Sequence, residues 1–154
     1  MGSLDSIDRQ LLSELQEEGR ITNVELAQRV GLTAPPCLRR VRALEEDGVI
    51  RGYHAELDAT KLGFAITVFA MVSLKSQAEN ALREFEAAMK SLPEVREVHM
   101  LNGEIDFILK IVSRDLQSFQ EFLTSKLTPA PNVASVKTSL TIRTSKHEPG
   151  VPLG

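Results

Sequence analysis

The spacing of apolar residues changes its period once along the chain, between residues 57 and 63, and this change limits the folds that the chain can adopt. Before it, apolar residues recur at the spacing of amphipathic helices. After it, segments in which apolar residues alternate with others are interleaved with helical stripes, which indicates strands and helices in turn. The sequence therefore predicts two domains of different class joined by a short linker.

The first domain, predicted over residues 1–56, begins with two helices. One carries its apolar residues on a single face and ends at Gly19; these residues are Leu4, Ile7, Leu11 and Leu15. Thr22 and Glu25 stand three positions apart and form a capping box that starts a second, short helix, which Gly31 ends. The inner stripe expected for this helix is Val24, Ala27 and Val30.

A third helix is expected to follow Thr33, because Pro35 and Pro36 fit the first turn, where no helical acceptor awaits their missing N–H groups. Its buried face is predicted to be Cys37, Val41 and Leu44, which directs Arg39 and Arg42 outward and puts Arg40 on the flank. The run "VIRGYHAEL", residues 49–57, predicts two short strands. Three helices and a small ribbon make a winged helix-turn-helix.

The outward arginines have two interpretations. They can solvate an exposed helix face and pair with Glu45 or Glu46, or they can read DNA, since this helix of the motif enters the major groove. Arginine forks suit guanine edges and phosphates. Residues 1–52 hold 7 arginines and 9 acids, so binding is expected to depend on fit and dimerisation. The predicted DNA contacts are Thr22, Asn23, Thr33, Ala34, Pro35, Pro36, Leu38, Arg39, Arg40 and Arg42.

The second domain, predicted over residues 64–147 after a linker at 57–63, reads as strand, helix, strand twice over. The strands are expected at 66–74, 95–101, 106–113 and 133–144, with one helix carrying Ala78, Leu82, Phe85 and Met89 and another capped by Asp115. This order is the split βαβ of the ferredoxin-like fold, and the fold class of the whole chain is α+β. Residues 148–154 have no core to join and are predicted to be disordered.

Composition excludes several classes of protein. The chain has 42% hydrophobic residues, 25% charged residues and a net charge of −3, which is typical of a globular protein and not of a nonspecific nucleic-acid binder. It has no apolar run long enough to span a membrane and no secretion signal, so a cytoplasmic location is expected. Cys37 is the only cysteine, and His54, His99 and His147 lack metal spacing, so neither a metal site nor a cofactor is predicted.

The residues then carry a family resemblance. The run from "GRITNVELAQRVGL" to "CLRRVRALEEDGVI", followed by a βαββαβ domain with "NGEIDFILKI", resembles the leucine-responsive regulator (Lrp/AsnC) family of bacterial and archaeal transcription factors over residues 4–146. The resemblance implies an N-terminal domain that binds double-stranded DNA and a C-terminal domain that dimerises through its sheet. It also implies assembly to tetramers, octamers or larger, and small effectors, usually amino acids.

The stretch "LNGEID" is a second candidate site. Asn102-Gly103 between two apolar runs favours a hairpin turn, because both residues accept positive φ. Asp106 can accept from an ammonium group while loop N–H groups bind a carboxylate. In the family resembled, the turn from Gly103 to Asp106 lines the effector pocket between dimers, and polar positions on the last strand complete it. The residues implied are Met100, Leu101, Asn102, Gly103, Glu104, Asp106, Thr138, Ser139 and Thr141.

Three other functions were weighed against a DNA-binding regulator. An enzyme subunit is disfavoured because no nucleophile-base pair or metal constellation is present. RNA binding by the sheet is disfavoured because Phe107 is the only aromatic residue of the predicted middle strands. A ligand-sensing module that only docks on other proteins, without DNA specificity of its own, stays open as the alternative.

Overall fold

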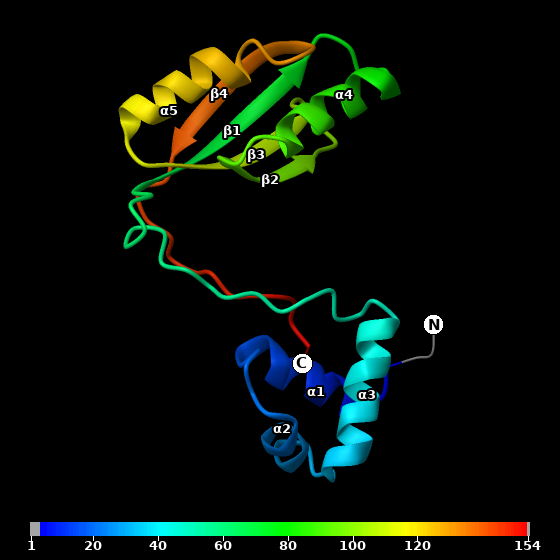
Figure 1. Ribbon diagram of the computed structural model, residues 1–154. Helices are drawn as coiled ribbons and strands as arrows, with labels where there is room; N and C mark the ends of the chain where they lie inside the picture. Colours follow the sequence, from blue (N-terminus) through cyan, green and yellow to red (C-terminus); the bar gives the residue numbers. More distant parts are fainter. Residues whose placement is uncertain (1–3, 154) are drawn as a thin grey trace. The chain divides into compact units, whose positions relative to one another are not determined.

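The computed structural model describes residues 4–153, so the first three residues of the predicted DNA-binding domain and the last residue of the predicted tail lie outside the described residues. The chain divides into two compact units (Figure 1). The helical unit comprises residues 1–56 together with 146–154, and the sheet unit comprises residues 57–145. Within the described part of the chain, no helix is long and apolar enough to cross a membrane.

The helical unit contains three helices among its described residues: α1 (Ser6–Glu17), α2 (Asn23–Arg29) and α3 (Ala34–Glu46). Its core is small and consists of the buried residues Leu11, Leu26, Ala27, Cys37 and Val41. The predicted buried face of α3 is confirmed, since Leu44 is buried as well. The predicted stripe of α2 is wrong at Val24, which is 57% exposed, because α2 turns Leu26 inward beside Ala27.

The helix starts follow from short-range hydrogen bonds. Asp5 and Asp8 form a capping box at α1, and the capping box of Thr22 and Glu25 at α2 is confirmed. Thr33 is the N-cap residue of α3, but its side chain makes no capping hydrogen bond. The reason is chemical: an N-cap side chain accepts from the second or third helical N–H, and at α3 these positions are prolines. The Thr33 hydroxyl is therefore left without its usual partner.

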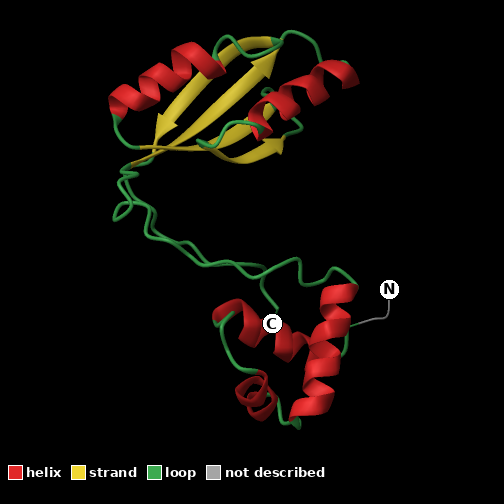
Figure 2. Ribbon diagram, in the orientation of Figure 1, coloured by secondary structure: helices red, strands yellow, loops and turns green. Residues whose placement is uncertain are grey.

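The predicted two-strand ribbon after α3 is not formed. Among the described residues, the stretch 49–57 contains no strand (Figure 2). Ile50 donates its N–H to the carbonyl of Leu44, which ties residues 49 and 50 to the end of α3. A strand needs a partner to satisfy its backbone groups, and residues 51–57 have no neighbouring segment paired with them in a ladder. The motif is therefore a helix-turn-helix with an extended arm.

The sheet unit has the predicted ferredoxin-like order. Its elements are β1 (Ile66–Leu74), α4 (Glu79–Lys90), β2 (Val95–Met100), β3 (Phe107–Ser113), α5 (Leu116–Phe122), the π-helical turn η1 (Leu123–Leu127) and β4 (Val133–Leu140). The sheet order is β2-β3-β1-β4, and every neighbouring pair is antiparallel. The last strand ends at Leu140, four residues earlier than predicted. The α+β class expected from the sequence is confirmed.

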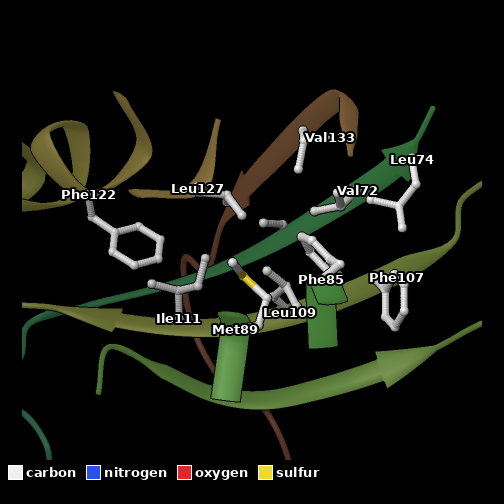
Figure 3. Close-up of a cluster of buried hydrophobic side chains, with 11 residues drawn as sticks. Val72, Leu74, Phe85, Met89, Phe107, Leu109, Ile111, Phe122, Leu127 and Val133 are labelled. Atoms are coloured by element: carbon white, nitrogen blue, oxygen red, sulfur yellow. The ribbon is translucent and has the colours of Figure 1, made fainter. Parts of the chain in front are cut away.

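A large apolar core lies between the sheet and the helices that cover one of its faces (Figures 1 and 3). Phe85 from α4 and Phe107 from β3 pack against each other with ring centroids 4.9 Å apart and ring planes tilted by 44°, and both are fully buried. The opposite face of the sheet carries no helix (Figure 2). Strand alternation directs Phe69, Met71 and Lys110 to that face, where Lys110 pairs with Glu97 at 2.9 Å. Because the middle strands of the sheet are β1 and β3, the prediction that Phe107 is their only aromatic residue is wrong: β1 adds Phe69.

The C-terminal segment, predicted from sequence to be disordered, has a defined contact with the helical unit. The Gln16 side chain on α1 accepts from the Val151 N–H at 2.8 Å and donates to the Val151 carbonyl at 3.0 Å. Gly150 precedes this contact with φ of 73° and lies against Gln16 so closely that a Cβ would clash. One side chain thus binds both polar groups of a backbone position, as a neighbouring strand would.

Candidate functional sites

The three arginines of α3 have different partners. Arg40 donates through Nη1 to Asp5 Oδ2 and to Asp8 Oδ1, both at 2.8 Å. This pairing raises the pKa of Arg40, while the N–H of Asp8 and then the Arg40 guanidinium hold the pKa of Asp5 below its ordinary value. Arg39 and Arg42 are exposed and make no ion pair with any described residue. Of the three arginines of α3, Arg39 and Arg42 therefore keep their donors available with respect to the described residues.

The other predicted DNA contacts divide in the same way. The Thr22 hydroxyl donates to Glu25, and the Asn23 side-chain amide donates to the Ala34 carbonyl at 2.9 Å, which holds α2 against the start of α3. Ala34 and Pro36 are half-buried. The residues that remain exposed at the start of α3 are Thr33, Pro35, Leu38, Arg39 and Arg42.

Geometry of this exposed patch fits a groove-reading helix. A helix of 13 residues is about 20 Å long and narrow enough for the major groove of B-DNA. Arg39 and Arg42 are three positions apart and therefore neighbours on one face of α3. Two guanidinium groups on that face can pair with guanine edges or with phosphate oxygens, while Leu38 supplies apolar contact.

A pocket lies at the end of the sheet where β2 passes into β3. Its volume is about 220 Å³, and it is lined by Gln77, Leu82, Met100, Leu101, Asn102, Gly103 and Asp106. The structure therefore brings together five of the nine residues predicted for the effector site. Glu104 belongs to the same loop and is exposed, but it does not line the pocket.

Asp106 is the charged group of this pocket, and both of its carboxylate oxygens already accept hydrogen bonds. Oδ2 accepts from the backbone N–H of Leu74 at 2.7 Å, and Oδ1 accepts from Nε2 of Gln77 at 3.0 Å. The backbone N–H of Asp106 donates to the Val72 carbonyl at 3.0 Å. Asp106 thus holds the start of β3 to the end of β1.

The predicted turn at Asn102-Gly103 is wrong in its conformation. Neither residue has positive φ, so the tight hairpin turn that the dipeptide favours is absent. The connection from β2 to β3 is a six-residue loop, 101–106, closed by a hydrogen bond from the Leu101 N–H to the Asp106 carbonyl at 2.9 Å. A Cβ at Gly103 would meet no atom within 4 Å. Gly103 therefore leaves open space beside the pocket.

The three polar residues predicted to complete the site lie elsewhere in the same chain. Thr138 and Ser139 are on β4, and Thr141 follows it, with its N–H donating to the Thr67 carbonyl. Because β4 and β2 are the two edges of the sheet, β1 and β3 separate these residues from the pocket. One chain alone does not assemble all nine residues.

Two residues of the pocket, Gln77 and Leu82, were not predicted as site residues. Leu82 was assigned to the core stripe of α4. It is half-buried, and it both packs against the core and lines the pocket. Gln77 lies between β1 and α4, and the only signal in the sequence is a polar residue just after a strand end. Its role depends on Asp106, 29 positions later, which local patterns do not reveal.

Other reactive groups form no further site. Cys37 is a free thiol buried in the helical unit, and burial raises its pKa. Across residues 4–153 no group of three or more histidine, cysteine or acidic side chains could hold a metal ion.

Comparison with known proteins agrees with this arrangement. Residues 4–51 match a family model described as winged helix-turn-helix DNA-binding, and residues 67–151 match one described as Lrp/AsnC ligand binding domain. A leucine-responsive regulatory protein of Rhizobium meliloti is 56% identical over 143 residues, which cover 93% of this chain and 92% of that protein. A bkd operon transcriptional regulator of Pseudomonas aeruginosa is 40% identical, covering 99% and 100%.

Solved structures of transcriptional regulators have the same fold as this chain. The chain superposes with a TM-score of 0.93 on a transcriptional regulator of Neisseria meningitidis in complex with L-Met, at 36% identity, covering 98% of this chain and 97% of that one. An AsnC family transcriptional regulator of Agrobacterium tumefaciens superposes with a TM-score of 0.91 at 31% identity, covering 97% of each chain.

Proposed function

The chain belongs to the Lrp/AsnC family of transcriptional regulators, and on that premise we propose that α3 reads an operator through Arg39 and Arg42 while the pocket beside Asp106 binds a free amino acid. Its curated relatives are named as regulators, and the proposed role is regulatory and not catalytic. As a DNA-binding regulator, the protein is proposed to act in the cytoplasm.

The single observation that carries the DNA-binding assignment is the division of labour among three neighbouring arginines. Arg40 is occupied by Asp5 and Asp8, whereas Arg39 and Arg42 are exposed and unpaired among the described residues. Arginine side chains without a carboxylate partner keep their donors for guanine or phosphate. The negative net charge favours recognition by shape and by these two side chains over bulk attraction.

The DNA test is a fluorescence-anisotropy titration of the full chain against its own promoter fragment and a shuffled fragment at two salt concentrations. Arg39→Ala with Arg42→Ala is expected to abolish the preference for the promoter, at about 1–3 kcal/mol per lost base contact. Arg9→Ala is the matched control, since Arg9 is exposed on α1 and outside the proposed contact set. Unchanged promoter preference in a folded double variant would show that Arg39 and Arg42 do not read the operator. No binding of the wild type to either fragment would favour the alternative, a docking module without DNA specificity.

The effector is proposed to bind with its ammonium group on Asp106 and its carboxylate near the loop 101–104. Support comes from the pocket volume of about 220 Å³, from the carboxylate that faces it, and from the complex of a relative with L-Met. Met100 and Leu82 give the pocket apolar walls that suit an apolar side chain. No metal or cofactor is part of this proposal.

Thr138, Ser139 and Thr141 enter the proposal through a second subunit. The order of strands separates them from the pocket of their own chain. Dimers would form through the helix-free face of the sheet, where Phe69 is 37% exposed, and would place two copies of α3 about 34–36 Å apart on a near-palindromic operator. Tetramers, octamers or larger assemblies would then bring β4 of one dimer to the pocket of another.

Gly103 provides a test of the pocket that spares the fold. Its φ is not positive and a Cβ there meets no neighbour, so Gly103→Ala and Gly103→Val are expected to fold normally. The larger side chain is expected to abolish amino-acid binding in isothermal titration calorimetry, and alanine is expected to weaken it. Gly19→Ala is the control, because Gly19 belongs to the helical unit and does not line the pocket. Full binding by Gly103→Val would show that the ligand does not use this pocket.

A further inference from the structure

Gln77 occupies the position on Asp106 that the proposed effector needs. Its amide nitrogen Nε2 donates to Oδ1 at 3.0 Å, and both residues line the same pocket. An amide NH₂ group and an ammonium group are both nitrogen donors, and they compete for the same carboxylate oxygen. The ligand-free pocket therefore already contains a substitute for the ligand's own donor.

The two hydrogen bonds to Asp106 differ in how readily they can be exchanged. Oδ2 is bound by the N–H of Leu74, which is the last residue of β1 and is buried, so this bond cannot leave without disturbing the strand. Oδ1 is bound by a side chain that is exposed and lies in an irregular segment between β1 and α4. A rotation about the side-chain torsions of Gln77 is enough to free Oδ1.

Charge decides which donor wins. A hydrogen bond from an ammonium group to a carboxylate is charge-assisted and stronger than one from a neutral amide. We propose that Gln77 is a built-in competitor whose amide stands in for the effector ammonium on Asp106 and is displaced when the effector binds. This inference rests on the proposed function of the pocket and adds a residue that sets its sensitivity.

The consequence for binding can be stated as a factor. While the amide is bound, the fraction of molecules with a free Oδ1 is reduced, and the apparent affinity for the effector falls by that fraction. A side-chain hydrogen bond to a charged group, weakened here by exposure, corresponds to a reduction of about three- to tenfold. Removing the amide is expected to tighten effector binding by the same factor.

The experiment compares Gln77→Ala with Gln77→Lys in the full chain by isothermal titration calorimetry. The probes are the twenty protein amino acids tried singly, beginning with L-methionine. Gln77→Ala is expected to bind the probe about three- to tenfold more tightly. Gln77→Lys, which keeps a tethered ammonium beside Asp106, is expected to bind it more weakly. Gln117→Ala, at an exposed glutamine of α5 whose side chain donates to Glu121 and lies outside the pocket, is expected to behave as the wild type.

A second probe tests that the competition is for the ammonium group. 4-(Methylsulfanyl)butanoate, the deamino analogue of methionine, has no nitrogen donor, so the step from wild type to Gln77→Ala is not expected to tighten its binding. Equal or weaker binding of the free amino acid by Gln77→Ala would overturn the inference, as would equal gains for both probes. If the wild type binds none of the twenty amino acids, the proposed function of the pocket fails first, and the inference fails with it.

Discussion

The helical unit and the sheet unit differ in the size of their apolar cores. Five buried residues form the core of the helical unit, whereas eleven form the core of the sheet unit. The helical unit supplements its core with ion pairs between helices: Arg29 with Glu14 and Glu18, and Arg40 with Asp5 and Asp8. Arg29 and Arg40 therefore connect helices of this unit to one another. On the surface of the helical unit, candidate functional charges are therefore those that are not already paired with another side chain.

The largest effect should come from truncating the larger core. Phe85→Ala removes a fully buried ring that packs against Phe107, and a loss of about 3–5 kcal/mol from the free energy of unfolding is expected. Hydrogen exchange of β1 and β3 amides measures it. Leu116→Ala, at a residue 62% exposed on α5, is the control and is expected to leave exchange unchanged. Comparable losses in the two variants would contradict the assignment of the core.

A similar truncation in the helical unit tests whether the two units are stabilised independently. Leu11→Ala removes a fully buried side chain from the small core, and a loss of about 2–5 kcal/mol is expected. Tyr53 is the only tyrosine of the chain, and it belongs to the helical unit, so its fluorescence during urea unfolding reports that unit alone. Hydrogen exchange of β3 should not change. A parallel loss of protection in β3 would show that the units unfold together.

The third prediction separates paired from unpaired arginines. Arg42→Ala is expected to weaken operator binding by about 1–3 kcal/mol and to leave the unfolding midpoint unchanged. Arg40→Ala is expected to lower the unfolding midpoint, because Asp5 and Asp8 lose their shared partner. Anisotropy and urea unfolding followed by Tyr53 fluorescence give the two readouts. If both variants change both quantities equally, the division between structural and functional arginines is not real.

The smallest effect is a pH dependence of the helical unit. The pKa of Asp5 lies below its ordinary value of 3.8, because the Asp8 N–H and then Arg40 stabilise the ionised form. A carboxyl group with a depressed pKa stabilises the fold above its unfolded pKa, and this contribution is lost as pH falls through the folded pKa. The urea concentration at the unfolding midpoint of the helical unit should therefore decrease when the pH is lowered below about 4. Asp5→Asn should make the midpoint less dependent on pH in this range. An unchanged pH dependence would show that Asp5 does not contribute to it.

Much of the fold could be predicted from sequence because it depends on local spacing. The alternation of apolar residues gave the bounds of β1 as found, and Thr22 with Glu25 marked the start of α2. Phe85 and Met89 were placed on the buried face of α4 by their spacing alone. These features depend on residues a few positions apart, which is the range over which periodicity carries information.

The predictions that failed depend on distant partners. The ion pair of Arg40 with Asp5, 35 positions earlier, also lies beyond local spacing, which placed Arg40 on the flank of α3; its predicted DNA contact stays a prediction. Asn102-Gly103 was expected to turn tightly, but Asp106 closes a longer loop instead. The expected ribbon at 49–57 needs a pairing strand, and a local pattern cannot tell whether one is present.

The two prolines at the start of α3 have a consequence for how an operator can be held. The first turn of a helix normally offers unpaired N–H groups that bind a phosphate through the main chain, whatever the side chains are. Pro35 and Pro36 remove two of these groups, so this helix start is a poor main-chain anchor for the DNA backbone. Contacts of this helix with the DNA then depend mainly on its side chains. A regulator built in this way can change its target by substitution at a few surface positions, with the scaffold that presents them unaltered.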